Sequence, residues 1–255
     1  MTGIRPKKEL GQHFLVDENI LGVIGRLAEL EPDDVVLEIG PGLGVLTRYL
    51  AERVALVHAV EIDRSLEPHL AEIPNLRLEV GDALQVDLAD LEPPPRKLVS
   101  NLPYNVATPV VVESLEGLPA IERWCVMVQR EVAERFFAQP ATKAYGAVSV
   151  LLQLATRRTG FHPVSRTVFR PVPNVDSALV AFRRRPLPDR FAQVKRLVEA
   201  SFAHRRKTLP NSIALAGLAS REAAVEALEA LGRPADTRGE TLHPLDFVEL
   251  ERLLP

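Results

Sequence analysis

The chain has 255 residues, of which 46% are hydrophobic and 25% are charged, so it can form one large globular domain or a large domain and a small one. No apolar run is long enough to span a bilayer, and the first residues lack the apolar core of a signal peptide, which makes the cytoplasm the expected location. The single cysteine, Cys125, excludes an internal disulfide and a cysteine-cluster zinc site, and the six histidines have no ligand spacing, so we expect no metal site.

The net charge of −3 argues against uniform affinity for nucleic acid, but the charge is unevenly distributed. Residues 183–210 contain nine Lys or Arg and two acids, whereas residues 211–255 contain four Arg and eight acids. A basic band inside an acidic protein is a candidate face for phosphate contacts. The alternative interpretation is a solvated helical face whose charges form ion pairs.

The first predicted elements are a polar lead, a helix and a strand. Residues 1–16 form the basic, polar lead, and Asp17 is placed to cap a helix that runs to about Leu30. The next apolar run, Val35 to Ile39, contains β-branched residues and is typical of a buried strand in a parallel sheet. Apolar residues at helical spacing begin again near Gly44, so we expect a second helix directly after a short turn.

This turn contains Gly40, Gly42 and Gly44, and Glu38 stands two residues before the first glycine. Glycines let the backbone approach a ligand closely, and a helix N-terminus offers unpaired N–H groups to the polar part of that ligand. The pattern E-x-G-x-G-x-G after a strand resembles the S-adenosylmethionine turn of class I methyltransferases. A dinucleotide fingerprint needs G-x-G-x-x-G, and Val45 occupies its third glycine position, which disfavours an oxidoreductase. A tight turn without a ligand is the alternative interpretation.

Acidic residues follow the next two predicted strands, 55–60 and 76–80. Glu61 lies 21 residues after Gly40, at the tip of the second strand, where a carboxylate is placed to accept hydrogen bonds from ribose hydroxyls. Asp82 follows the third strand and can accept from an adenine amino group. A helix cap or turn residue is the alternative interpretation for Asp82.

The stretch Asn101-Leu102-Pro103-Tyr104 follows the fourth predicted strand, 97–100. The exocyclic amine of adenine is a poor nucleophile because its lone pair is delocalised into the ring. The side-chain oxygen of Asn101 and the carbonyl of Leu102 can accept its two N–H bonds, which favours a pyramidal nitrogen aimed at a methyl group, without a metal. Tyr104 can stack on the base.

Phe169 is a second aromatic candidate for the opposite face of the base. The alternative interpretation of Phe169 is an aromatic residue packed under a loop. It lies in the stretch 168–177, which is predicted to be an extended loop. The catalytic candidates are therefore Asn101, Leu102, Tyr104 and Phe169.

After Arg185 the pattern changes and predicts only helices, so we place a domain boundary there. We expect an S-adenosylmethionine-binding catalytic domain at 1–185 and a helical domain for RNA or ribosome contact at 186–255. The remaining predicted helices are 65–72, 106–115, 130–137, 145–154, 191–202, 211–215, 221–230 and 244–253. The remaining predicted strands are 120–128, 157–161 and 178–182.

Nine stretches, in order along nearly the whole chain, resemble the KsgA-type (RsmA) small-subunit rRNA adenine N6-dimethyltransferases. They are KKELGQHFL, VLEIGPGLGVLT, VEID, GDAL, NLPYNVATPV, MVQREVAERF, YGAVSVLLQ, VFRPVPNVDSALV and FAHRRKTLPN. The resemblance implies an α/β, class I S-adenosylmethionine-dependent methyltransferase fold, Rossmann-like, with a seven-stranded mostly parallel sheet, one antiparallel strand and a small all-helical C-terminal domain. It also implies dimethylation of two adjacent adenosines in the 3′-terminal hairpin of 16S rRNA, in a late pre-30S particle of the small ribosomal subunit.

The resemblance implies roles for individual residues. Gly40 would line the methionine part of the cofactor, Glu61 the ribose and Asp82 the adenine, and Asn101 would lie beside both the cofactor and the target amine. The implied cofactor-binding residues are Gln12, His13, Leu15, Glu38, Gly40, Gly42, Glu61, Asp82, Ala83 and Asn101. The implied RNA-binding residues are Lys8, Arg205, Arg206 and Lys207.

Two positions depart from the family pattern. His13 takes the place of an asparagine, although a neutral imidazole still donates one hydrogen bond. Pro210 stands where a basic residue is common, which removes one expected phosphate contact.

Two alternatives stay open at this point. The Erm type dimethylates an adenosine in large-subunit rRNA and confers macrolide resistance, but VFRPVPNVDSALV and the C-terminal segment favour the KsgA type. An RNA-binding assembly factor without turnover is the alternative from another class, and intact Glu61, Asp82 and NLPY argue against it. We expect a monomer, because nothing in the sequence suggests an interface helix.

Overall fold

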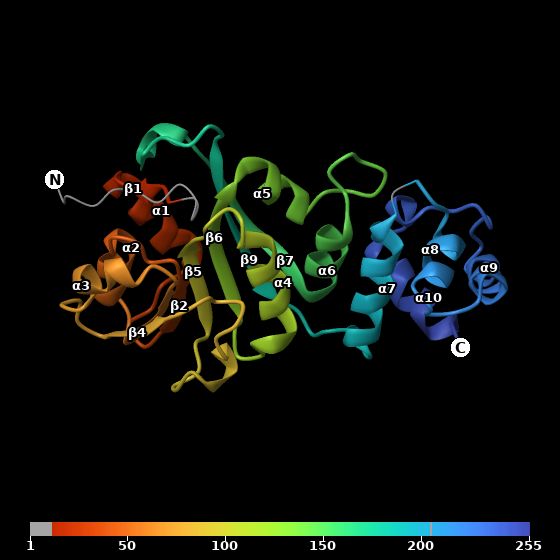
Figure 1. The fold of residues 1–255 in the computed structure, drawn as a ribbon, viewed down its shortest axis with the longest axis horizontal. Coiled ribbons are helices and arrows are strands. Elements are labelled where there is room, and N and C mark those ends of the chain that lie inside the picture. Colours follow the sequence, from red (N-terminus) through yellow and green to blue (C-terminus); the bar gives the residue numbers. More distant parts are fainter. Residues whose placement is uncertain (1–11, 205) are drawn as a thin grey trace. The chain divides into compact units, whose positions relative to one another are not determined.

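The computed structural model describes residues 12–204 and 206–255, which form two compact units (Figure 1). The first unit contains residues 12–133 and 158–184, and the second contains residues 134–157 and 185–255. None of the helices in these described ranges has the length and apolar character needed to cross a membrane.

A seven-stranded sheet forms the centre of the first unit (Figure 1). Its strands are β2 (Val35–Ile39), β3 (Leu56–Glu61), β4 (Leu76–Val80), β5 (Lys97–Asn101), β6 (Arg123–Gln129), β7 (Thr156–Val164) and β9 (Ser177–Arg184). Their order is β4-β3-β2-β5-β6-β9-β7; the pairs from β4 to β6 are parallel, and β9 runs antiparallel to β6. The expected class I methyltransferase fold, with a mostly parallel sheet, is confirmed.

The central strands are buried because their sequences are nearly continuous apolar runs, as parallel sheets require. In β2, Val36 and Leu37 are fully buried and Ile39 is nearly so, which confirms the predicted strand. The helices of this part of the chain are α1 (Glu18–Ala28), α2 (Val45–Ala51), α3 (Glu67–Leu70), α4 (Ala107–Gly117) and α5 (Arg130–Phe136). Short 3₁₀ turns are η2 (Arg64–Leu66), η3 (Leu88–Asp90) and η4 (Arg166–Val168).

Two helix starts test the capping predictions. Asp17 caps α1 as expected, because its carboxylate accepts from the backbone N–H of Asn19 at 2.8 Å. At the predicted helix 65–72, which begins with a possible cap in Ser65, the cap is Asp63 instead, and it accepts from both the backbone N–H and the hydroxyl of Ser65. The Asp63 carboxylate stands directly before the turn and reaches its free N–H groups, so Ser65 becomes part of the helical segment.

A two-stranded sheet that the sequence did not reveal joins the lead to the predicted loop 168–177. Strand β1 (Phe14–Leu15) pairs antiparallel with β8 (Phe169–Arg170). The stretch is therefore not loop throughout. Strands of two residues have no detectable apolar alternation, and their stability comes from the partner strand rather than from local sequence.

The second unit is helical. Its helices are α6 (Ala147–Ala155), α7 (Phe191–Ala203), α8 (Leu209–Leu215), α9 (Arg221–Ala230) and α10 (Pro244–Leu253), with a 3₁₀ turn η5 (Gly239–Thr241). Tyr145, Phe202 and Phe247 pack ring against ring in its core, and the Tyr145 hydroxyl donates to the carbonyl of Leu242 at 2.8 Å. We expected a single boundary near Arg185, but residues 134–157 also belong to the second unit. They do so because α6 packs against α7 and α10.

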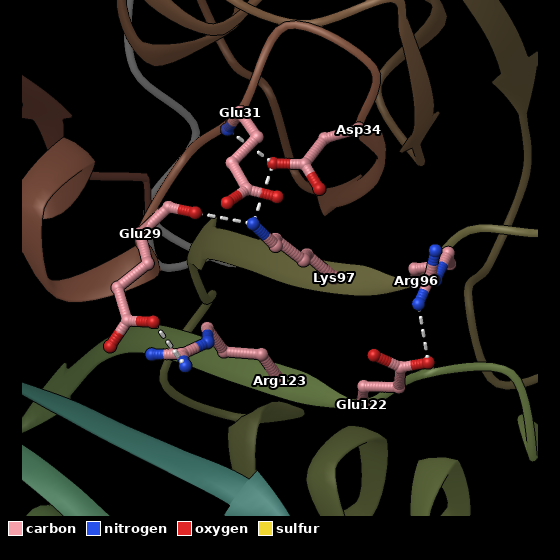
Figure 2. A network of polar contacts seen from close by, with 7 residues as sticks. All are labelled: Glu29, Glu31, Asp34, Arg96, Lys97, Glu122 and Arg123. Carbon is pink, nitrogen blue, oxygen red and sulfur yellow. Dashed lines mark hydrogen bonds and ion pairs between the residues drawn. The ribbon is translucent and has the colours of Figure 1, made fainter.

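A polar network fastens the turn after α1 to the starts of β5 and β6, as Figure 2 shows. The ammonium of Lys97 pairs with Asp34 at 2.6 Å and also donates to the backbone carbonyl of Glu29. The buried guanidinium of Arg123 pairs with the Glu29 carboxylate at 2.5 Å. The network therefore links the turn after α1 to the end of the sheet at which β5 and β6 begin.

Candidate active site

A cavity opens at the carboxyl ends of β2, β3, β4 and β5, within the first unit, and encloses about 1030 Å³ including the part open to solvent. The order of the strands reverses between β2 and β5, which is where open α/β sheets bind ligands. Of the predicted catalytic and cofactor-binding residues, those that line the cavity are Gln12, His13, Leu15, Glu38, Gly40, Gly42, Glu61, Asp82, Ala83, Asn101, Leu102 and Tyr104.

The glycine turn between β2 and α2 requires glycine for two reasons. Gly40, Gly42 and Gly44 all have positive φ angles, between 58° and 77°, which L side chains rarely adopt. A Cβ on Gly40 would lie 2.9 Å from the ring of Pro103, and one on Gly42 would lie 3.1 Å from the ring of Phe14. The absence of side chains at Gly40 and Gly42 therefore lets Pro103 and Phe14 pack directly against the turn.

Glu61, at the end of β3, binds the glycine turn through its carboxylate. One oxygen accepts from the N–H of Gly42 at 3.0 Å and the other from the N–H of Asp63 at 2.8 Å. Burial raises the pKa of Glu61 above its usual value, although these two N–H groups oppose the shift. Each oxygen keeps a lone pair for a further donor, such as a ribose hydroxyl.

Glu38, near the end of β2, lines the same cavity and is 1% exposed. Its Oε2 has no hydrogen-bond partner among the described residues, and neither has the buried hydroxyl of Thr47 on α2. Burial raises the pKa of Glu38 to about 8, and the negative charge of Glu61 adds to this shift. The site thus contains a buried carboxyl with an unused acceptor.

Asp82 and Ala83 line the cavity just after β4. The two carboxylate oxygens of Asp82 accept from the N–H of Leu84 at 3.0 Å and from the side-chain amide of Gln85 at 3.1 Å. Asp82 therefore caps the turn, which was the alternative interpretation of this residue. It also lies on the cavity wall, so its contact with the cofactor stays a prediction.

The described part of the lead lies along the cavity and is held at several points. Gln12 donates to the carboxylate of Asp63 at 3.0 Å, and the Nδ1 of His13 lies 2.8 Å from the carbonyl of Pro171. Leu15 is buried opposite Phe169 in the β1–β8 pair. These contacts place His13 and Leu15 on the cavity wall, with Phe14 between them packed against Gly42, which sequence spacing alone does not indicate.

Asn101, the last residue of β5, has its side-chain amide oriented by the lead. Its Nδ2 donates to the backbone carbonyl of His13 at 3.3 Å, so Oδ1 is the atom left to accept a hydrogen bond in the cavity. The following residue, Leu102, is 1% exposed and its N–H donates to the carbonyl of Met127 on β6 at 3.1 Å. Backbone pairing with β6 therefore fixes the position of the NLPY stretch.

Tyr104 contacts two residues at the cavity. Its hydroxyl lies 2.7 Å from the Oγ of the buried Ser177, the first residue of β9, and its ring centroid lies 5.7 Å from that of His13. Burial raises the pKa of Tyr104 above its ordinary value, so the phenol is neutral at physiological pH and available as a stacking surface.

Phe169 does not line the cavity. Its side chain is fully buried among core residues that include Leu15, Ile20 and Leu179, so the predicted sandwich of a base between Tyr104 and Phe169 is not formed in this structure. Phe169 is therefore an aromatic residue packed in the core, as its alternative interpretation proposed. The ring that lies beside Tyr104 is that of His13, with the two ring centroids 5.7 Å apart.

Two of the predicted RNA-binding residues, Lys8 and Arg205, lie outside the described residues. Arg206 and Lys207 are exposed in the turn between α7 and α8, in the second unit. Pro210, the departure from the family pattern, is buried in the first turn of α8, where its missing N–H costs no helical hydrogen bond.

Sequence reasoning missed several residues that shape the site. Pro103 and Phe14 pack against the glycine turn, and Ser177 holds the Tyr104 hydroxyl. Pro103, Phe14 and Ser177 each stand inside a motif that the resemblance singles out, but their contacts join segments far apart in the sequence. No local pattern predicts such contacts.

The cavity fits S-adenosylmethionine by its chemistry. Among the described residues that line it there are three carboxyl side chains and no Lys or Arg, which suits a ligand that carries positive charge. The orphaned Glu38 oxygen and the side-chain-free glycine turn provide a polar acceptor and room for close backbone approach.

Comparison with known proteins gives the relationship directly. The sequence profile of the family described as "Ribosomal RNA adenine dimethylase" matches residues 3–232. The chain is 51% identical to "Ribosomal RNA small subunit methyltransferase A" of Rubrobacter xylanophilus, over 97% of this chain and 95% of that relative.

Solved structures agree on the fold. A dimethyladenosine transferase from Plasmodium falciparum superposes with a TM-score of 0.76 at 24% identity, covering 93% of this chain and 96% of that chain. The 23S rRNA methyltransferase ErmE superposes with a TM-score of 0.66 at 30% identity, covering 94% and 99%. With the profile match, the near full-length relative and a cavity of fitting chemistry, the chain belongs to the ribosomal RNA adenine dimethylase family.

Proposed function

We propose that this protein is an S-adenosylmethionine-dependent rRNA (adenine-N6,N6)-dimethyltransferase of the small ribosomal subunit. Its substrate is 16S rRNA, where it dimethylates two adjacent adenosines in the 3′-terminal hairpin during ribosome biogenesis. The observation that carries this proposal is Asn101: its amide nitrogen is engaged by the His13 carbonyl, so its oxygen is left to accept from an amine in the cavity. The relatives at 42–51% identity that bear the small-subunit name support the choice of substrate.

The cofactor is held by the turn after β2 and by the acids of the neighbouring strands. Gly40 and Gly42 leave room for the methionine part, Glu61 accepts from the ribose hydroxyls, and Asp82 with Ala83 receives the adenine. Glu38 and the lead residues Gln12, His13 and Leu15 complete the enclosure. S-adenosylmethionine, when bound, supplies a methyl group made electrophilic by its attachment to a sulfonium.

The chain's part in the chemistry is to hold the target amine and direct its lone pair. An unstacked adenosine enters the cavity beside Tyr104, whose ring is fixed by Ser177. Asn101 Oδ1 and the Leu102 carbonyl accept the two amine N–H bonds, which reduces delocalisation of the lone pair into the ring. Positioning of this kind needs no general base before attack, because the amine loses its proton only after it is alkylated.

The buried position of Phe169 removes one contact that was expected from the sequence, the aromatic ring on the second face of the target base. Because Phe169 is buried in the core, the base stacks on Tyr104 without a sandwich partner from that residue. The His13 ring beside Tyr104 is the aromatic surface available instead.

Phosphate contacts come from basic residues in both parts of the chain. Arg206 and Lys207 are exposed, as contact with a large RNA requires. Lys8 and Arg205 stay candidates from the resemblance. The protein acts as a monomer in the cytoplasm on a late pre-30S particle, and because these contacts are electrostatic, binding weakens steeply as salt increases.

An assay with two substrates tests the proposal. The purified protein is incubated with radiolabelled S-adenosylmethionine and either undermethylated small or large ribosomal subunits. We expect label in small-subunit rRNA, recovered as N6,N6-dimethyladenosine. Label only in the large subunit would instead support the Erm-type activity, which the 30% identity to the 23S rRNA methyltransferase ErmE keeps as the second candidate.

A third result separates catalysis from binding alone. Absence of label in both subunits, with cofactor binding intact, would point to an RNA-binding assembly factor without turnover. The intact Asn101, Glu61 and Asp82 at the cavity argue against that outcome.

A further inference from the structure

The segment 165–176, which contains η4 and β8 and leads into β9, is attached to two residues that line the cavity (teal in Figure 1, beside β1). The carbonyl of Pro171 lies 2.8 Å from the Nδ1 of His13. Ser177, the residue that follows the segment, has its Oγ 2.7 Å from the Tyr104 hydroxyl. Because the proposed function places the target base beside Tyr104, this segment borders the side of the cavity at which RNA arrives.

The backbone of this segment directs two arginines toward solvent. Successive side chains of a strand point to opposite faces, so the burial of Phe169 in the core directs Arg170, the next residue of β8, outward. Arg166, the first residue of η4, is exposed as well. The pairing of β8 with β1 and the buried ring of Phe169 fix the backbone from which both arginines extend.

Both guanidinium groups are held by backbone carbonyls of the same segment. The Nη1 of Arg170 donates to the carbonyls of Thr167 and Phe169, at 3.1 and 2.9 Å. The Nη1 of Arg166 donates to the carbonyl of Asn174 at 3.3 Å. A guanidinium has five N–H donors, so each arginine keeps donors for a further acceptor. Because these side chains are already ordered, binding such an acceptor costs less conformational entropy.

The positive charges of these arginines are not neutralised by carboxylates. In the described parts of the chain, neither Arg166 nor Arg170 takes part in an ion pair. The one acid of the segment, Asp176, accepts from the backbone N–H of Arg166 at 3.2 Å. By contrast, the exposed Arg252 pairs with Glu249 at 2.8 Å. Ordered guanidinium groups without a carboxylate partner are suited to phosphate, whose oxygens accept two parallel N–H bonds.

We propose that Arg166 and Arg170 bind backbone phosphates of the RNA strand next to the target adenosine. This inference rests on the proposed function, because it concerns the same cavity and its RNA substrate. Phosphate contacts fix the register of a strand without reading its sequence. The two arginines therefore hold the strand on the Tyr104 side of the cavity, whereas the proposed contacts of Arg206 and Lys207 belong to the second unit.

Methyl transfer to undermethylated small subunits by the full chain tests these contacts through the split between KM and kcat. Arg166→Ala and Arg170→Ala each remove a charged contact with the substrate, so each should raise KM for small subunits about three- to tenfold. Once the RNA is bound, the target amine still meets Asn101, so kcat should stay within about twofold. The affinity for S-adenosylmethionine should be unchanged, which shows that the variants are folded.

The salt dependence of binding to small subunits identifies the contacts as phosphate contacts. Each arginine replaced by Ala should reduce the magnitude of the slope of log affinity against log salt by about 0.7–0.9, because one fewer counterion is displaced from the RNA. Arg166→Lys and Arg170→Lys keep the charge and should keep the slope, although a lysine cannot form two parallel bonds to one phosphate.

Arg96→Ala is the matched control for the loss of one positive charge. Arg96 is exposed and immediately precedes β5, at the opposite end of the sheet from the cavity, so KM and the slope should not change. Unchanged KM and slope in the double variant Arg166→Ala/Arg170→Ala would overturn the inference.

A photocrosslink identifies the partner of the segment. Val172 is 46% exposed and lies two residues after Arg170, so p-benzoylphenylalanine in place of Val172 reports what lies against the segment. With small subunits bound, we expect a crosslink to the 3′-terminal hairpin of 16S rRNA. A crosslink only to a ribosomal protein, or none while binding is intact, would refute the proposed phosphate contacts.

The outcomes separate this inference from the proposed function. Label in small subunits from the unmodified protein, with KM unaffected in the double variant, overturns only the role of Arg166 and Arg170. Absence of label in small subunits from the unmodified protein overturns the proposed function, and this inference with it.

Discussion

At the scale of single residues, the site consists of side chains whose remaining hydrogen-bonding capacity is set by contacts already made. Asn101 has its amide nitrogen engaged by the His13 carbonyl, Tyr104 has its hydroxyl engaged by Ser177, and Glu61 binds the glycine turn. Glu38 alone among them keeps a buried oxygen without a described partner. Preorganisation of this kind lowers the reorganisation needed when a substrate arrives.

Replacement of Asn101 tests the contact with the target amine. Asn101→Ala removes the acceptor Oδ1, and we expect the turnover number to fall by about 100-fold or more, by analogy with the loss of a preorganised polar group. The measurement is single-turnover methyl transfer to small subunits, with cofactor binding measured separately. Asn105→Ala is the matched control, because Asn105 also lines the cavity but is exposed, and it should keep near-normal turnover. Near-normal turnover of Asn101→Ala would contradict the proposed role.

Ser177 is expected to position the ring of Tyr104. Ser177→Ala and Tyr104→Phe each remove the same hydrogen bond, so each should reduce kcat/KM for the RNA by a similar, roughly three- to tenfold factor. The double variant should have a kcat/KM no lower than that of either single variant, because both substitutions remove the same hydrogen bond. Effects that multiply in the double variant would mean that the two residues act independently.

The buried Glu38 gives a pH dependence of stability. Its pKa in the folded protein, about 8, is above its ordinary value of 4.5, so the stability it contributes is complete below about pH 4.5 and is lost as the pH rises towards 8. We expect the difference in unfolding free energy between the unmodified protein and Glu38→Gln to fall with pH by up to about 1.4 kcal/mol per unit in this window. Urea unfolding at several pH values measures it, and parallel curves for the two proteins would contradict it.

At the scale of elements, the polar network of Figure 2 joins residues from the turn after α1 and from the starts of β5 and β6. Its ion pairs differ in exposure. Lys97 and Asp34 have side chains only 11% and 8% exposed, whereas the side chains of Arg96 and Glu122 are 61% and 54% exposed. The two pairs lie at the same end of the sheet, and the buried pair also has further hydrogen bonds, from Lys97 to the Glu29 carbonyl and from the Glu31 N–H to Asp34.

This difference predicts unequal costs of removing one partner. Lys97→Met leaves the Asp34 carboxylate buried without its cation, and we expect a loss of about 3 kcal/mol in unfolding free energy. Arg96→Met removes a solvated pair and should cost less than about 1 kcal/mol. Chemical denaturation of both variants measures the difference, and equal costs would show that burial does not control the contribution of this network.

At the scale of the whole molecule, the described chain forms a sheet-centred unit that contains the cavity and a helical unit that carries exposed Arg206 and Lys207. The helical unit also includes α6 from the middle of the chain, because α6 packs against α7 and α10. The chain therefore passes between the units more than once, and the proposed RNA contacts of the helical unit belong to a part of the protein distinct from the catalytic cavity.

Salt dependence of RNA binding tests the contribution of the helical unit. Replacing Arg206 and Lys207 by Ala removes two exposed cations, and we expect the slope of log affinity against log salt to decrease in magnitude by roughly one to two. Arg252→Ala is the control, since Arg252 is exposed and pairs with Glu249 on its own helix, and it should leave the slope unchanged. An unchanged slope in the double variant would remove this turn from the RNA-binding surface.

The sequence by itself determined the sheet, most helices and, at the cavity, the glycine turn, the acids at strand ends and the NLPY stretch, because apolar periodicity, glycine turns and acids at strand ends are local signals. The lead residues Gln12, His13 and Leu15 were expected only from the family resemblance. Strand β2, the turn at Gly40 and the NLPY stretch are where those signals predicted them. Only the tertiary structure decided the β1–β8 pair, the buried position of Phe169 and the contact of Ser177 with Tyr104. Each of these depends on segments distant in sequence, whose pairing is selected by packing and long-range hydrogen bonds rather than by local pattern.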